Sequence, residues 1–266
     1  MASKRLLQRL KPYVPAQMLP AAIFVYRRIF LRALAGVHDA RDRRRPVSGI
    51  PLPPASLRAR VHTLPDAKSF FEVGRRWVSG LEAGLERADR SLESFTSVLD
   101  FGCGCGRTLR WLDWLAGRAS LAGTDIDGEC VRWCAENIPF AHFSQNDPLP
   151  PLEFANEAFD LVYAISVFTH LTESAQDAWL AELRRVTRPG AILLLSTHGP
   201  HTWPSLPPRY RQRVEQDGFL WVDATDNAYH SPAYIRERWS TYFEVLDIIN
   251  PHSVVGYQDL VVARRT

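Results

Sequence analysis

The chain has 266 residues, of which 46% are hydrophobic and 23% are charged, and its formal net charge at pH 7 is +3. This length suits one large α/β domain with extensions or two small domains, and the apolar content excludes a chain that is disordered throughout. The sequence has only four cysteines, which is not the disulfide framework of a small secreted domain, and we therefore expect a reducing, cytoplasmic compartment.

The first 60 residues form a basic arm. They contain 13 Lys and Arg residues against two Asp, a net charge of +11, whereas the remainder has 19 basic and 27 acidic residues, a net charge of −8. The apolar stretch 14–26 contains two prolines and is too short for a membrane-spanning helix, which needs about 20 residues. It is also a poor signal peptide, because proline breaks it and arginines follow it closely.

Two interpretations of this arm stay open. One is a helical extension that caps the main domain or forms an oligomer contact, and the other is a basic amphipathic segment in peripheral contact with an anionic membrane. No recognised nucleic-acid-binding motif accompanies the charge, so we expect no nucleic-acid partner. The proline-rich segment 39–54 reads as a linker, which predicts an arm and linker over 1–54 and a main domain over 55–266.

The main domain alternates predicted helices and strands. Apolar residues at helical spacing predict a first helix over 66–89. Strands are then predicted at 95–100, 120–125, 141–144, 159–165 and 191–196, with helices at 106–116, 128–136 and 173–187 between them. Continuous apolar strands between helices predict a mostly parallel sheet that is covered on both faces. Two β-rich runs, 242–249 and 254–263, fit an antiparallel pair at its edge.

A glycine-rich turn follows the first predicted strand. The strand ends in Asp100, and Gly102, Gly104 and Gly106 follow at every second position. Glycines allow a tight turn and let a ligand approach the backbone, while the N–H groups that open the next helix face that ligand. The spacing is G-x-G-x-G, whereas the phosphate-binding fingerprint of dinucleotide sites is G-x-G-x-x-G.

This turn resembles motif I of the class I S-adenosylmethionine-dependent methyltransferases, and the resemblance extends over roughly residues 94–266. It implies S-adenosyl-L-methionine as the cofactor, whose ammonium group suits a carboxylate at Asp100, where a pyrophosphate would be repelled. The implied fold is a Rossmann-like, doubly wound α/β sheet of seven strands, mostly parallel with an antiparallel edge pair, preceded by an N-terminal helical extension. Cofactor contacts are expected from Asp100, Gly102, Cys103, Gly104 and Gly106.

The resemblance implies further cofactor residues at the ends of later strands. Asp125 follows Gly106 by 19 residues, the distance at which an acid binds ribose hydroxyls in dinucleotide sites. Ile126 would pack on the adenine ring, and Asp147 or its neighbour Asn146 would take the adenine amino group, although Asn-Asp-Pro also suits a simple turn. Ser166 lies in the exit from strand four, expected beside the sulfonium. Asp127 is predicted to be a helix N-cap.

Three histidines are candidate catalytic groups: His170, His198 and His230. Histidine suits removal of a proton from a hydroxyl acceptor near neutral pH. His170 could instead be a loop residue that orients the start of the next helix. The insertion 203–240 is expected to set acceptor specificity. We expect no metal, because the loop already explains the Cys103-x-Cys105 spacing and free cysteine is a common core residue.

The predicted function is methyl transfer from S-adenosylmethionine to a small-molecule or glycan acceptor, with oxygen as the expected target. One alternative is a nicotinamide-dependent oxidoreductase on the same fold class, against which the glycine spacing and the preceding acid argue. The other is a catalytically inactive cofactor-binding protein that serves as a partner. The expected location is the cytoplasm, with the arm as a candidate for peripheral membrane contact.

Overall fold

The computed structural model describes residues 36–39, 49–61, 66–250 and 258–266. Most of the basic arm therefore lies outside the described residues, and its two interpretations stay predictions. The chain divides into two compact units, Met1–Phe70 and Phe71–Thr266. The first contains helix α3 (Ala55–Val61), in which the buried Arg58 guanidinium donates to the Pro53 carbonyl at 2.6 Å. The predicted domain boundary at residue 54 stays a prediction.

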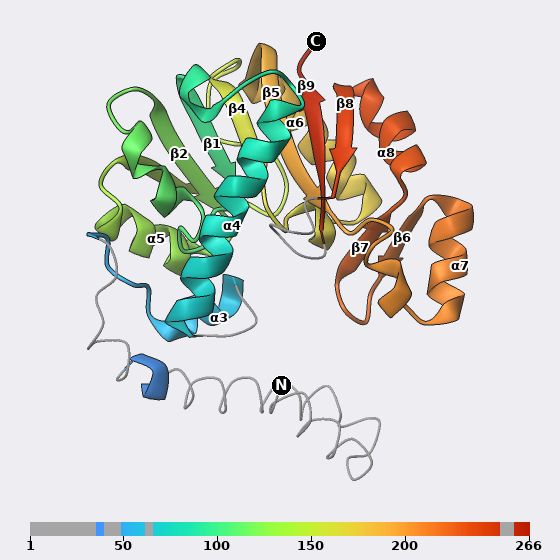
Figure 1. The fold of residues 1–266 in the computed structure, drawn as a ribbon, viewed down its shortest axis with the longest axis horizontal. Helices are drawn as coiled ribbons and strands as arrows, with labels where there is room; N and C mark the ends of the chain where they lie inside the picture. The colour runs from blue at the N-terminus through green and yellow to red at the C-terminus, as the bar shows by residue number, and fades with distance from the viewer. Residues whose placement is uncertain (1–35, 40–48, 62–65, 251–257) are drawn as a thin grey trace. The chain divides into compact units, whose positions relative to one another are not determined.

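The second unit is built on a seven-stranded sheet in the order β3-β2-β1-β4-β5-β9-β8 (Figure 1). Its strands are β1 (Ser97–Phe101), β2 (Ser120–Asp125), β3 (Ala141–Gln145), β4 (Phe159–Ala164), β5 (Thr187–Thr197), β8 (Glu244–Ile249) and β9 (Asp259–Arg264). Neighbouring strands from β3 to β5 are parallel, and β9 is antiparallel to both β5 and β8. The predicted fold class is confirmed.

Helices lie in the connections. They are α4 (Ala67–Glu86), α5 (Gly128–Asn137), α6 (Glu173–Val186), α7 (Pro208–Asp217) and α8 (Pro232–Arg238). Asp127 caps α5 as predicted, because its carboxylate accepts from the N–H groups of Glu129 and Cys130. The predicted helix 106–116 is instead a 3-10 helix, η4 (Leu109–Leu115), preceded by turns. Helix α4 packs closely against the turns before η4, since a Cβ on Gly74 of α4 would lie 2.2 Å from the Arg107 carbonyl oxygen.

Residues 188–190 lie inside β5 but are not paired with β4. The register between the two strands shifts between Phe159 and Leu161 and leaves these residues as a bulge. Gly190 adopts a φ of 82°, which glycine tolerates without a steric penalty. The change of chain direction after α6 therefore takes place inside β5 and not before it.

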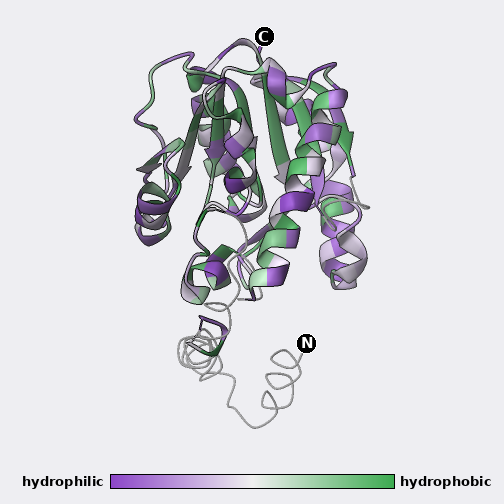
Figure 2. Ribbon diagram, turned by 60° about the vertical axis from the view of Figure 1, so that its left-hand side comes forward, coloured by the Kyte–Doolittle hydropathy of each residue, from purple (hydrophilic) through white to green (hydrophobic). Residues whose placement is uncertain are grey.

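Both faces of the sheet are covered by helices. Residues of α6, such as Trp179 and Leu183, pack with Leu99 of β1 and Val162 of β4 in one buried cluster, which α8 extends. On α4, a Cβ at Gly84 would lie 2.9 Å from a methyl of Leu260, so that helix approaches the sheet closely. Figure 2 shows hydrophobic residues concentrated on the strands and polar residues on the outer sides of the helices. Strands buried on both faces explain the continuous apolar runs of the sequence.

The segment after β5 forms a small lobe with its own core. It contains α7 and a hairpin of β6 (Phe219–Val222) and β7 (Asn227–His230), which pair with each other in a separate two-stranded sheet (Figure 1). Four buried residues form its core: Leu206, Val214, Leu220 and Val222. This lobe lies within the predicted insertion 203–240.

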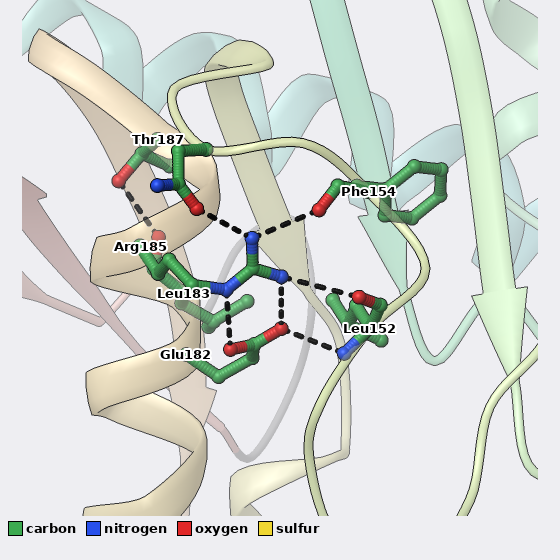
Figure 3. A network of polar contacts seen from close by, with 7 residues as sticks. Leu152, Phe154, Glu182, Leu183, Arg185 and Thr187 are labelled. Carbon is green, nitrogen blue, oxygen red and sulfur yellow. Dashed lines mark hydrogen bonds and ion pairs between the residues drawn. The ribbon is translucent and has the colours of Figure 1, made fainter.

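A polar network fixes the long connection before β4 (Figure 3). The Arg185 guanidinium donates to the carbonyl oxygens of Leu152 and Phe154 at 3.1 and 2.9 Å and forms an ion pair with Glu182 at 2.6 Å. Glu182 in turn accepts from the Leu152 N–H at 2.6 Å. The pair neutralises a buried carboxylate while it satisfies the backbone of the connection.

Among the described residues, no helix is long and apolar enough to cross a membrane.

Candidate cofactor and acceptor site

The glycine loop adopts a conformation that only glycine takes readily. Gly102, Gly104 and Gly106 have φ values of 82°, 53° and 71°, in the left-handed region. At Gly102 a Cβ would lie 2.2 Å from a methyl of Val167, so the loop also lies directly against the exit from β4. The residues predicted for this loop are therefore brought together at the carboxyl ends of β1 and β4.

Asp125 is held against this loop. Its Oδ2 accepts from the Gly104 N–H at 2.7 Å, and its Oδ1 accepts from the Asp127 N–H at 2.8 Å. Burial raises the pKa of this carboxyl, and the two N–H groups oppose that rise. Carboxylate oxygens have further lone pairs, so Asp125 can still accept from the hydroxyls of a bound ribose.

Asp100 lies near the end of β1, two residues before Gly102, and is only 2% exposed. Burial raises the pKa of its carboxyl to about 8; the nearby Tyr163 hydroxyl lowers it, Asp125 raises it and Arg107 lowers it. A carboxyl with this pKa is mostly protonated at neutral pH, and a cation placed beside it would stabilise the carboxylate form.

The ends of β2 and β3 place the remaining predicted cofactor residues. Ile126 is 60% exposed, which leaves an apolar surface available to a planar ring. Asn146 is buried and its amide oxygen accepts from the Thr124 hydroxyl at 2.8 Å, while Asp147 is exposed. The Asn146 side chain is thus already hydrogen-bonded within the protein, whereas the Asp147 side chain is exposed to solvent.

Ser166 has a backbone conformation rare for a residue with a side chain. Its φ is 61°, and the surrounding groups hold it there: its N–H donates to the Ser196 hydroxyl at 2.7 Å, and its own hydroxyl accepts from Gln258 at 2.9 Å. Such strain persists only where the surroundings impose it, and it is concentrated at functional sites. The hydrogen bonds of Ser166 therefore link the end of β4 to β5 and to the residue that precedes β9.

His170 and His198 lie near each other, after β4 and β5, with ring centroids 6.5 Å apart. The β6–β7 hairpin binds both: His170 Nδ1 lies 2.7 Å from the Asp226 carbonyl oxygen, and His198 Nδ1 lies 3.2 Å from that of Ala228. A carbonyl oxygen only accepts, so each Nδ1 carries a proton and each Nε2 is left as an acceptor. Burial lowers the pKa of His198 to about 4, which keeps its ring neutral.

His230 is in a different environment. It is completely buried, and its Nε2 lies 3.0 Å from the side-chain oxygen of Gln176. The Gln176 amide nitrogen donates to the carbonyl oxygens of Phe168 and Leu171, so its oxygen must accept from His230. Burial lowers the pKa of His230 to about 3. The structure places this predicted catalytic residue in the core as a link between β7 and α6.

Sequence reasoning missed several contributors to the site. Tyr163 opposite Asp100, Gln258 on Ser166 and the hairpin carbonyls on the two histidines are all long-range contacts. No spacing or periodicity in the sequence marks them. Asp160 has a structural role, because its carboxylate accepts from the N–H groups of Thr96 and Ser97.

The residues present fit S-adenosylmethionine. The buried Asp100 carboxyl suits a cationic group, Asp125 and the glycine loop suit a ribose and a closely approaching chain, and the exposed Ile126 suits an adenine face. Within the described ranges, no group of three or more His, Cys, Asp or Glu side chains could hold a metal ion.

Comparisons with known proteins agree with this geometry. A family described as a methyltransferase domain matches residues 98–190. A malonyl-[acyl-carrier protein] O-methyltransferase of Enterobacter lignolyticus is 28% identical over 167 residues, 62% of each chain. A 2-methyl-6-phytyl-1,4-hydroquinone methyltransferase of Synechocystis is 31% identical over 137 residues, 50% of this chain and 41% of that one. The PH0226 protein of Pyrococcus horikoshii has the same fold, with a TM-score of 0.54, 19% identity and coverage of 72% of this chain and 91% of that one.

The fold and the site define a cofactor-binding α/β protein of the methyltransferase type. Residues 98–190 therefore match a methyltransferase-domain family, and this similarity, together with the fold, implies S-adenosyl-L-methionine as the cofactor. It spans 62% and 41% of the length of the two curated relatives named above.

Proposed function

We propose that this protein transfers a methyl group from S-adenosylmethionine to an oxygen of a small-molecule or glycan acceptor. The observation that carries this proposal is the glycine loop with three left-handed residues, tied by the Gly104 N–H to Asp125 and lying beside the buried Asp100. The proposed cofactor residues are Asp100, Gly102, Cys103, Gly104, Gly106, Asp125, Ile126, Asn146, Asp147 and Ser166.

Bound S-adenosylmethionine would supply an electrophilic methyl group on a sulfonium. The chain's own residues would hold the two reactants in line, and orientation of this kind can lower a barrier by about 7–11 kcal/mol. The ammonium suits Asp100, the ribose suits Asp125 and the adenine suits Ile126. The strained turn at Ser166 would fix the wall of the site between the cofactor and the acceptor.

His170 and His198 are our candidates for the group that receives the acceptor's proton. Both present an unprotonated Nε2, because hairpin carbonyls occupy both Nδ1–H groups. Burial lowers the pKa of His198 to about 4, so its Nε2 is a weak base that favours an acidic acceptor hydroxyl, while the His170 side chain is exposed to solvent. His230 is left out of this pair because it is buried and bonded to Gln176. The two relatives named above are a carrier-protein-linked acyl O-methyltransferase and a hydroquinone methyltransferase, which supports acceptors bearing a hydroxyl or carboxyl group.

The first experiment is titration calorimetry of the purified protein with S-adenosylmethionine and, separately, with NADH. We expect binding of S-adenosylmethionine alone. Tight NADH binding without S-adenosylmethionine binding would replace the proposal with the oxidoreductase alternative.

The second experiment follows transfer of a labelled methyl group to a panel of hydroxyl acceptors: a hydroquinone, simple phenols, free sugars and a malonyl thioester. With the best acceptor, His198→Ala and His170→Ala are compared with the parent protein, and loss of a true base should lower turnover about 10²- to 10⁴-fold. Losses below about threefold in both variants would remove the histidine pair from the mechanism. Cofactor binding without transfer to any class would favour a catalytically inactive binding protein.

A further inference from the structure

The carbonyl of the middle glycine in the loop is bound by two thiols. The Gly104 oxygen lies 3.6 Å from Cys103 Sγ and 3.5 Å from Cys134 Sγ, and both thiols donate to it. Cys134 belongs to α5, 30 residues further along the chain, and it is completely buried. Its sulfur also lies beside Gly106, where a Cβ would be 3.3 Å away. A carbonyl oxygen has two lone pairs, so the two thiols satisfy it fully.

The Cys103 thiol keeps its proton. The contact with Cys134 and burial raise the pKa of the Cys103 thiol well above its ordinary value, as do the nearby carboxyls of Asp100 and Asp125. A protonated thiol is a donor and a poor nucleophile, so the pair is suited to hydrogen bonding.

The two thiols determine which way the next amide points. The peptide bond between Gly104 and Cys105 is trans, so its N–H is directed opposite to its C=O. With the carbonyl turned toward α5, the Cys105 N–H is turned away from that helix. Among the described residues, no hydrogen bond uses this N–H. The other side of Gly104 is fixed as well, because its N–H donates to Asp125.

We propose that Cys134, together with Cys103, is a positioning residue of the cofactor site: the thiols hold the Gly104 carbonyl toward α5 so that the Cys105 N–H is presented to the carboxylate of the cofactor's amino-acid part. This inference rests on the proposed function, because it takes S-adenosylmethionine as the ligand. It adds a role for α5 that the loop sequence does not contain.

The test compares two ligands and three variants by titration calorimetry. S-adenosylhomocysteine has the amino-acid part, and 5′-methylthioadenosine lacks it but keeps the adenosine. Cys134→Ala removes the donor and Cys134→Ser restores one. Cys130→Ala is the matched control, because Cys130 is buried on the same helix and its thiol contacts the Cys105 side chain rather than the Gly104 carbonyl. Cys134→Val, of similar volume and without a donor, replaces Cys134→Ala if that variant does not fold.

We expect Cys134→Ala to weaken S-adenosylhomocysteine binding about 3- to 10-fold, the effect of one lost hydrogen bond. Cys134→Ser and Cys130→Ala should stay within about twofold of the parent, and methylthioadenosine binding should be equal in all four proteins. Equal S-adenosylhomocysteine binding by Cys134→Ala and the parent would overturn the proposal. Equal losses for both ligands would also overturn it, since they would indicate a general structural role. A parent protein that binds neither ligand would refute the proposed function itself.

Discussion

At the scale of single residues, Asp125 links the glycine loop to the proposed ribose site. Its carboxylate accepts from the Gly104 N–H and has further lone pairs for the ribose hydroxyls. We expect Asp125→Ala to weaken S-adenosylmethionine binding about tenfold or more, since hydrogen bonds to a charged group contribute about 1.5–3 kcal/mol. Calorimetry measures the change and circular dichroism checks the fold. Methylthioadenosine, which keeps the ribose, should be weakened as well, and an unchanged dissociation constant would mean that another residue binds the ribose.

Asp100 predicts a pH dependence of cofactor binding. Its pKa of about 8 in the free protein means that the carboxyl is mostly protonated at pH 6.5, whereas a bound cation favours the carboxylate. Binding then releases a proton, so affinity should rise as the pH increases from 6 to 7.5, by at most tenfold per pH unit. Asp100→Asn should remove this slope. Calorimetry in two buffers of different ionisation enthalpy measures the released proton, and an identical slope in both proteins would contradict this assignment.

At the scale of elements, the β6–β7 hairpin orients the two histidines through its backbone. Asp226 has a φ of 50° and its carbonyl accepts from His170. Glycine adopts this φ freely and a β-branched residue resists it, at a cost of about 1–3 kcal/mol for a strained position.

We therefore expect Asp226→Val, but not Asp226→Gly, to loosen the hairpin carbonyl from His170. The fraction of His170 protonated at Nδ1, measured by ¹⁵N chemical shifts, should fall in Asp226→Val and be retained in Asp226→Gly. Cofactor affinity should be unchanged in both, because the proposed cofactor residues lie at the ends of β1 to β4 and in the loops that follow them. The same Nδ1 protonation in all three proteins would show that the hairpin does not set the tautomer.

At the scale of the whole molecule, every proposed cofactor residue lies in the unit Phe71–Thr266, while the excess positive charge lies in residues 1–60. We predict that a chain beginning at Val37 binds S-adenosylmethionine as the full chain does. It should also lose any association with anionic phosphatidylserine vesicles that the full chain shows at low salt, because basic residues near such a surface each contribute about 1 kcal/mol and salt screens them.

Two measurements decide this prediction. Vesicle sedimentation of the full chain at low and high salt tests the arm, and absence of any association would leave the cap or oligomer-contact interpretation. An insoluble truncated chain would show instead that the arm covers part of the core.

The sequence by itself determined which segments form the strands of the large sheet, the glycine loop at the end of β1, the acid at the end of β2 and the cap of α5. These features are local: apolar runs, glycine spacing and a capping aspartate act within a few residues of their own positions. Only the tertiary structure decided which polar groups meet. In it, His230 is buried and hydrogen-bonded to Gln176. His170 and His198 are hydrogen-bonded to backbone carbonyl oxygens 56 and 30 residues further along the chain, and the Cys134 thiol donates to the Gly104 carbonyl. Such contacts depend on how helices and the hairpin pack on the sheet, and no local pattern of residues encodes that packing.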